Sequence, residues 1–136
     1  MKTQKSWAEF YRDFLRDEGF RPNIDDNGHV VFKFESGSYM ICIDSDDEQF
    51  FQLIYLFGFE IESQEEFHRA MNACVNITRD TKVVKLSVIK DELSSFVASV
   101  EAFVDSPEAV TKKVFDRYLS VIQDCVGKFV KHMRES

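Results

Sequence analysis

The stretch HVVFKFESGSYMICID, residues 29–44, decides the fold. Apolar side chains occupy every second position on both sides of Ser36 and Gly37, namely Val30, Phe32, Phe34, Tyr39, Ile41 and Ile43. Alternation with a period of two is typical of strands with one buried face, and a Ser-Gly pair between two such runs indicates a two-residue turn. The sequence therefore predicts an antiparallel hairpin with its turn at Ser36 and Gly37, Phe34 opposite Tyr39, and Phe32 opposite Ile41.

The other face of this hairpin is half apolar, because it carries His29, Val31, Lys33, Met40 and Cys42. A face that meets only water is ordinarily more polar, so this one needs cover. Either the C-terminal helix covers it within the chain, or a second copy or another protein does. Val31, Lys33, Met40 and Cys42 are the candidate protein-binding residues.

The segments on either side of the hairpin predict two helices and a further strand. Ser6 and Glu9 have the spacing of a capping box, and aromatic residues recur at helical intervals until Gly19. FFQLIYLFGFEI, residues 50–61, is interpreted as a third strand with two apolar faces, both of which must be covered. Ser63 and Glu66 then open a second helix, whose expected buried stripe is Phe67, Ala70, Met71, Cys74, Val75 and Thr78.

The C-terminal half predicts a second hairpin and a long helix. KVVKLSVI and LSSFVASVEAFV are rich in β-branched and aromatic residues and are separated by a predicted turn at Lys90 and Asp91. Ser106, Pro107 and Glu108 combine three signals of a helix start. The expected stripe of that helix is Val110, Val114, Tyr118, Val121, Ile122, Cys125, Phe129 and Met133. Residues 1–136 thus predict a single α+β domain in the order helix, three-stranded antiparallel meander, helix, β-hairpin, long C-terminal helix.

The charge and the apolar content of the sequence indicate which kinds of partner and which cellular location to expect. The 136 residues include 24 acidic and 17 basic side chains, a net charge of −7, so nucleic acid is not the expected partner. The start MKTQKSWAEF lacks a signal peptide's apolar run, and no stretch has the roughly 18 apolar residues of a membrane helix, so a cytoplasmic location and no membrane contact are expected. The 3 cysteines show no CxxC spacing, and the 14 phenylalanines predict a phenylalanine-rich core.

This order of elements resembles the YbjN family, described as candidate regulators of bacterial sensory transduction. The resemblance covers nearly the whole chain and rests on FRPNIDDNGHVVFKFESGSYMICID, DEQFFQLI, the IES that opens the middle helix, TKVVKLSV and FVDSPEAVTKKVFDRYL. It implies a fold similar to that of the type III secretion chaperones, small α+β proteins that commonly dimerise and hold segments of partner proteins. The family brings no catalytic motif.

The acidic loops raise the question of a metal. The motif NIDDNG places Asn23, Asp25 and Asn27 on the first three ligand positions of a calcium loop, but Phe34 stands where the bidentate Glu is required. The motif is therefore interpreted as a polar turn with positive backbone torsions at Asn27 and Gly28. No metal site and no cofactor are predicted.

The sequence also allows two other functions. The hairpin register brings one acidic pair, Asp25 and Asp26, to the same end of the sheet as a loop with Asp44, Asp46, Asp47 and Glu48. A small-ligand or divalent-cation sensor using this edge is the alternative function. The same register puts His29 opposite Asp44 and near Cys42, but no oxyanion turn follows the cysteine, so packing is the interpretation and no catalytic residue is predicted. The leading hypothesis is a noncatalytic protein-binding adaptor or chaperone-like regulator, whose partner is another protein or a second copy of itself.

Overall fold

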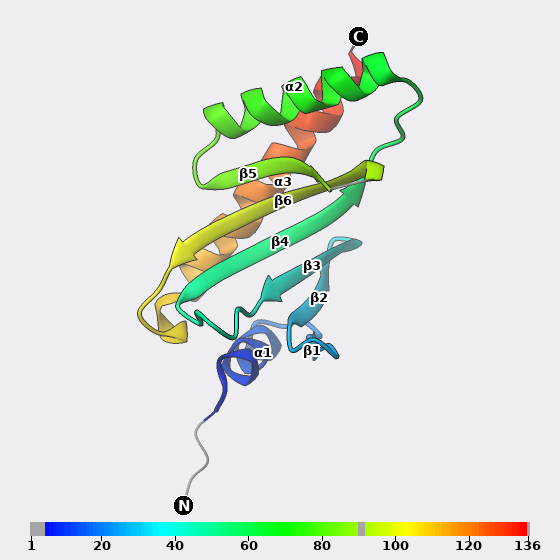
Figure 1. The fold of residues 1–136 in the computed structure, drawn as a ribbon. Helices are drawn as coiled ribbons and strands as arrows, with labels where there is room; N and C mark the ends of the chain where they lie inside the picture. Colours follow the sequence, from blue (N-terminus) through cyan, green and yellow to red (C-terminus); the bar gives the residue numbers. More distant parts are fainter. Residues whose placement is uncertain (1–4, 90–91, 136) are drawn as a thin grey trace, which may run out of the picture.

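Three α-helices and a six-stranded antiparallel sheet make up the computed structural model, which describes residues 5–89 and 92–135 (Figure 1). The elements are α1 (Trp7–Asp17), β1 (Asn23–Ile24), β2 (Val30–Phe34), β3 (Gly37–Cys42), β4 (Phe50–Gly58), α2 (Gln64–Asp80), β5 (Val84–Ile89), β6 (Glu92–Phe103), a 3₁₀ turn η1 (Pro107–Ala109) and α3 (Lys112–Arg134). The strands are ordered β1-β2-β3-β4-β6-β5. The predicted α+β order is confirmed, with β1 and η1 as additions. The predicted turn at Lys90 and Asp91 lies outside the described residues.

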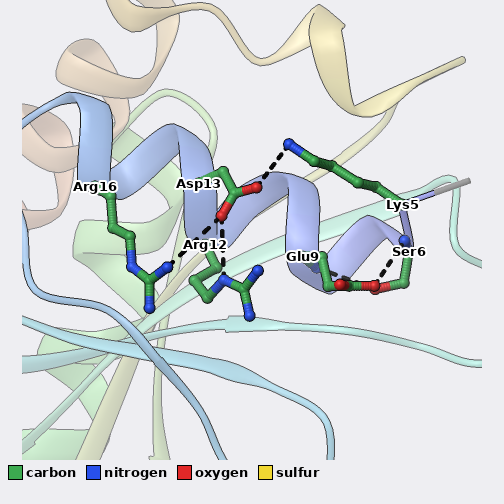
Figure 2. A network of polar contacts seen from close by, with 6 residues as sticks. All are labelled: Lys5, Ser6, Glu9, Arg12, Asp13 and Arg16. Atoms are coloured by element: carbon green, nitrogen blue, oxygen red, sulfur yellow. Dashed lines mark hydrogen bonds and ion pairs between the residues drawn. The ribbon is translucent and has the colours of Figure 1, made fainter. Parts of the chain in front are cut away.

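The start of α1 has the predicted capping box (Figure 2). The Ser6 hydroxyl accepts a hydrogen bond from the Glu9 N–H at 3.1 Å, and the Glu9 carboxylate accepts one from the Ser6 N–H at 3.2 Å. The hydrogen bond that the Ser6 N–H donates to the Glu9 carboxylate lowers the pKa of Glu9. One turn later, the Asp13 carboxylate forms ion pairs with three cations, Lys5, Arg12 and Arg16. The first turns of α1 are thus fixed by local polar contacts.

The β2–β3 turn lies one residue earlier than predicted. Glu35 and Ser36 form it, with φ of 47° and 68°, and Phe34 pairs with Gly37. Positive φ at both central residues is the geometry of a type I′ turn, which matches the twist of the flanking strands. Phe32 therefore lies opposite Tyr39, and the predicted pairing of Phe34 with Tyr39 is wrong.

Gly37 is needed in the strand, and that need explains the error. A Cβ atom on Gly37 would lie 2.6 Å from Cε1 of Tyr55 and 3.2 Å from Cε1 of Tyr39. The two tyrosines are paired across β3 and β4, and their rings stack with centroids 4.7 Å apart. Only a glycine leaves room for this stack. Gly37 is therefore required for packing within the strand, and not for the backbone torsions of the turn.

The predicted phenylalanine-rich core lies between one face of the sheet and the helices α1 and α3. Its buried phenylalanines are Phe32, Phe51, Phe96, Phe115 and Phe129. Phe115 of α3 contacts Phe32 of β2, and Phe129 of α3 contacts Phe96 of β6 with centroids 4.8 Å apart. The long C-terminal helix therefore packs on this side of the sheet, which we call the inner face, and Figure 1 shows it passing behind β4 and β6.

The helix α2 lies at the β5 edge of the sheet and beside α3, so its buried side differs from the predicted one (Figure 1). Ala70, Ala73 and Cys74 are its buried residues. Met71 and Val75, which the stripe had placed in the core, are 42% and 65% exposed. Small side chains face the neighbouring elements because α2 packs against an edge and a helix at close range, and not flat on the sheet.

The helix α3 begins later than predicted. Ser106 makes no side-chain cap, and Pro107 and Glu108 belong to the short turn η1. The helix starts at Lys112, where the Thr111 hydroxyl accepts a hydrogen bond from the Val114 N–H at 3.3 Å. The helix-start signals at residues 106–108 thus produce a single 3₁₀ turn, because Val110, which follows η1, leaves the helical region of backbone torsions with ψ of 86°.

Thr78 of α2 caps backbone groups on the edge of β5 that does not pair with another strand in the described part of the chain. The Thr78 hydroxyl of α2 accepts a hydrogen bond from the Leu86 N–H at 2.9 Å and donates one to the Leu86 carbonyl at 3.2 Å. Edge strands otherwise present unpaired backbone groups that can recruit other strands. The contact therefore ties α2 to the sheet and closes part of this edge.

Candidate protein-binding face

The face of the sheet opposite the inner face, here the outer face, carries the candidate residues. Directly paired residues of neighbouring antiparallel strands point to the same side of a sheet. Val31 of β2 pairs with Met40 of β3, and Met40 pairs with Ile54 of β4. These residues alternate with the buried ones along each strand. An apolar row therefore runs across three strands of the outer face.

A second row lies beside the first, toward the β2–β3 turn. Lys33 pairs with Ser38, Ser38 with Leu56, and Leu56 with Val97 of β6. Leu56 is 43% exposed and Val97 is partly exposed. The four predicted residues, Val31, Lys33, Met40 and Cys42, thus lie on one face, and the structure adds Ile54, Leu56 and Val97.

Sequence reasoning did not predict these added residues, although the sequence contains a pattern that indicates them. The segment that forms β4 has apolar residues on both faces, and its second face is the one that continues the outer face across the sheet. The strand order, which places β4 between β3 and β6, was needed to join the two observations.

The C-terminal helix does not cover this face. Phe129 of α3 packs against Phe57 of β4 and Phe96 of β6, which belong to the inner face. The alternative in which α3 covers the outer face is therefore wrong. Met40, Cys42 and Ile54 are half-buried by their neighbours on the sheet.

Part of the outer face is concave. A cavity of about 300 Å³ is lined by Arg21, Val31, Lys33, Met40 and Leu56, among others. The Lys33 ammonium also donates a hydrogen bond to the Ser38 hydroxyl. Apolar side chains and two cations thus line the same hollow, which is an arrangement suited to an apolar side chain with a carboxylate nearby.

The grouping of Cys42, His29 and Asp44 has a geometry unlike that of a nucleophile and its base. The three residues line one open cavity of about 390 Å³. However, Nδ1 of His29 accepts a hydrogen bond from the Ile43 N–H at 2.9 Å, and the Asp44 carboxylate accepts one from the Asp46 N–H at 3.0 Å. Burial raises the pKa of Cys42 to about 11. The cysteine is therefore a neutral thiol at pH 7, and a thiolate is the reactive form.

The acidic loops use their carboxylates to order their own backbone. Oδ1 of Asp25 accepts hydrogen bonds from the N–H groups of Asn27 and His29, both at 2.9 Å. Gly28 has the predicted positive torsion, with φ of 85°, whereas Asn27 does not. Among residues 5–89 and 92–135, no three His, Cys, Asp or Glu side chains are arranged to hold a metal ion.

Comparison with known proteins shows the fold. No family model matches the chain, and no curated protein matches it. An uncharacterised protein from Methanothermobacter thermautotrophicus is similar in structure, with a TM-score of 0.71 and 14% identity over 96% of this chain and 98% of that one. YbjN from E. coli, a candidate transcription regulator, is similar with a TM-score of 0.62 and 14% identity over 89% of this chain and 86% of that one.

A secretion chaperone has the same fold. SycH from Yersinia pestis, solved in complex with a stable fragment of YscM2, is similar with a TM-score of 0.56 and 11% identity over 93% of this chain and 98% of that one. The chain is therefore similar in fold to YbjN and to a type III secretion chaperone. No helix within the part of the chain that the structure describes has the length and apolar character needed to cross a membrane.

Proposed function

We propose that the protein is a noncatalytic adaptor or chaperone-like regulator that binds another protein through the outer face. The observation that carries this proposal is the apolar row of Val31, Met40 and Ile54, extended by Leu56 and Val97, on a face that α1 and α3 leave open. A solvated sheet face is ordinarily polar, so a continuous apolar row favours an interaction surface.

Energetics support the same proposal. Covering apolar surface contributes about 25 cal/mol per Å² before the costs of ordering two partners. Met40 lies in the middle of the row, where contacts that exclude water contribute most. Arg21 and Lys33 line the hollow beside it and favour a partner with a carboxylate near its apolar side chain.

Two comparisons add support without identifying the partner. YbjN is a candidate regulator, and SycH was crystallised with a fragment of another protein. We infer a cytoplasmic location from three free cysteines, Cys42, Cys74 and Cys125, since reduced thiols persist in that compartment.

The test is a crosslinked affinity capture of the tagged protein from the cells that make it, followed by mass spectrometry. Met40→Asp is compared with Val75→Asp, which puts the same charge at an exposed apolar position of α2, away from the sheet. We expect a recurrent partner that Met40→Asp loses and Val75→Asp keeps. Circular dichroism and thermal unfolding show whether each variant is folded.

Each other outcome is informative. A folded Met40→Asp variant that captures the same partners would place the binding surface elsewhere and refute the proposal. If Met40→Asp unfolds, Leu56→Asp replaces it, because Leu56 is already 43% exposed. Light scattering after size exclusion shows whether the partner is a second copy of the chain.

A further inference from the structure

A second cavity lies on the helix side of the molecule, away from the outer face. Its volume is about 300 Å³, and it is lined by Lys82, Val83, Val114, Arg117, Tyr118 and Val121. Lys82 and Val83 belong to the loop between α2 and β5, and the other four belong to α3. The cavity therefore lies where the start of the long helix passes the loop that leads into the edge strand.

The helix supplies an apolar wall. Val114, Tyr118 and Val121 are spaced so that they share one side of α3, and all three are partly exposed. They were expected in the core, but the helix buries the neighbouring stripe, which includes Phe115, Leu119 and Ile122. The Tyr118 ring stacks on the buried Phe51 with centroids 5.8 Å apart, so its position is fixed. Tyr118 and Val121 therefore pack partly against the core, and their exposed parts line the cavity together with Val114.

The loop supplies a second apolar wall at an energetic cost. Val83 has a φ of 59° and is 59% exposed. A β-branched residue with positive φ is strained, and glycine or asparagine would adopt this torsion more easily. The Val83 side chain is exposed and does not belong to the hydrophobic core. The observation favours a role for its side chain at the cavity.

Two cations stand beside these walls. Neither Lys82 nor Arg117 forms an ion pair with a carboxylate of residues 5–89 or 92–135. The chain as a whole has 24 acidic and 17 basic residues, so a site with two cations and no acid differs from its average surface. Lysine and arginine offer eight N–H donors between them and can hold an anionic group.

We propose that this cavity binds a small amphipathic organic anion. Its charged group lies against Lys82 and Arg117, and its acyl or aromatic part lies between Val83 and the apolar side of α3. A volume of about 300 Å³ is at the lower end for ligand cavities, which suits a molecule the size of a medium-chain carboxylate. The proposal is independent of the adaptor function, because none of its residues lies on the outer face.

The first experiment is a titration of the ¹⁵N-labelled protein with octanoate, followed by amide NMR shifts. We expect saturable shifts in residues 81–84 and the first half of α3. Octylammonium, with the opposite charge, and acetate, without the apolar part, are the matched probes and should leave these shifts unchanged. Arg117→Glu should weaken octanoate binding about tenfold or more, since a hydrogen bond to a charged group is worth at least that factor.

Two further variants keep the test sharp. Lys131→Glu makes the same change of charge at an exposed position near the other end of α3 and should leave the affinity within about twofold. Val83→Gly removes the apolar wall together with the strain, so it should weaken binding without lowering the melting temperature. The proposal is overturned if octanoate gives no saturable shifts, if octylammonium gives the same shifts, or if Arg117→Glu and Val83→Gly bind octanoate like the parent protein.

Discussion

Replacing Gly37 with alanine tests the packing of the first hairpin. The new Cβ would lie 2.6 Å from Cε1 of Tyr55, a distance at which one ring must move. Tyr55 is held by stacking on Tyr39 at 4.7 Å and on Phe57 at 5.6 Å, so movement disturbs a row of rings. Overpacking of this kind costs about 1–3 kcal/mol, and the smaller backbone entropy of alanine offsets about 0.5–1 kcal/mol. We expect a net loss of about 1–2 kcal/mol.

Urea unfolding followed by circular dichroism measures this loss, and thermal unfolding should show a decrease of about 4–8 °C. The matched control is Gly127→Ala, because Gly127 lies exposed inside α3 with nothing within 4 Å of the added Cβ. That variant should be more stable by about 0.5–1 kcal/mol. Opposite signs for the two substitutions would separate the steric clash from the general effect of replacing glycine.

A second substitution shows whether the clash is the cause. In a Tyr55→Leu background the ring is gone, so Gly37→Ala should cost about 1 kcal/mol less than in the parent protein. If Gly37 instead sat in the turn with a positive φ, alanine would be strained in both backgrounds and Tyr55→Leu would rescue nothing. An undiminished penalty in the Tyr55→Leu background would therefore refute the pairing of Phe34 with Gly37.

Two other predictions concern buried polar groups. Burial raises the pKa of Cys42, Cys74 and Cys125 to about 11 from an ordinary 9. The folded chain therefore keeps these protons to higher pH than the unfolded chain does, so the free energy of unfolding should fall as pH rises from about 9 to 11. Urea midpoints that stay unchanged across pH 8–11 would contradict this prediction. Thr78→Val should cost about 1–3 kcal/mol because the Leu86 N–H and carbonyl lose their partner. Hydrogen exchange at the Leu86 amide should then be faster, and an unchanged rate would show that the Thr78 hydroxyl does not protect this amide.

The order of elements could be predicted because its signals are local. The capping box at Ser6 and Glu9 and the alternation around Ser36 need only a few neighbouring residues to act. The register could not be predicted, because Gly37 is required by Tyr55, a residue of another strand. The prediction of the buried side of α2 was wrong for a similar reason, because that side is set by contacts with other elements. Its own periodicity allowed Met71 and Val75 to be buried, and only its position at the sheet edge decides between them and Ala73.

The candidate site was predicted in part. Val31, Lys33, Met40 and Cys42 share a face in the predicted and in the observed pairing, because the two pairings differ by two positions and strand alternation has a period of two. The residues contributed by β4 and β6 depend on the order of strands in the sheet, which alternation does not specify. The cavity beside α3 had only a weak signal, a stripe wider than one buried face. The torsion of Val83 that completes it is a property of the folded loop.

The position of β4 in the sheet has a consequence for how the chain is made. Its residues pair on one side with β3, which is synthesised just before them, and on the other side with β6, which is synthesised much later. Phe50 pairs with Phe103, and Gly58 pairs with Ser95. At synthesis rates of about 5–20 residues per second, this interval lasts a few seconds. During that time the segment FFQLIYLFG has one open edge and two apolar faces, which is the composition of an aggregation-prone strand. The nascent chain is therefore at its most vulnerable between the fourth strand and the sixth, and the ribosome-bound intermediate at that length is where a general chaperone would be needed.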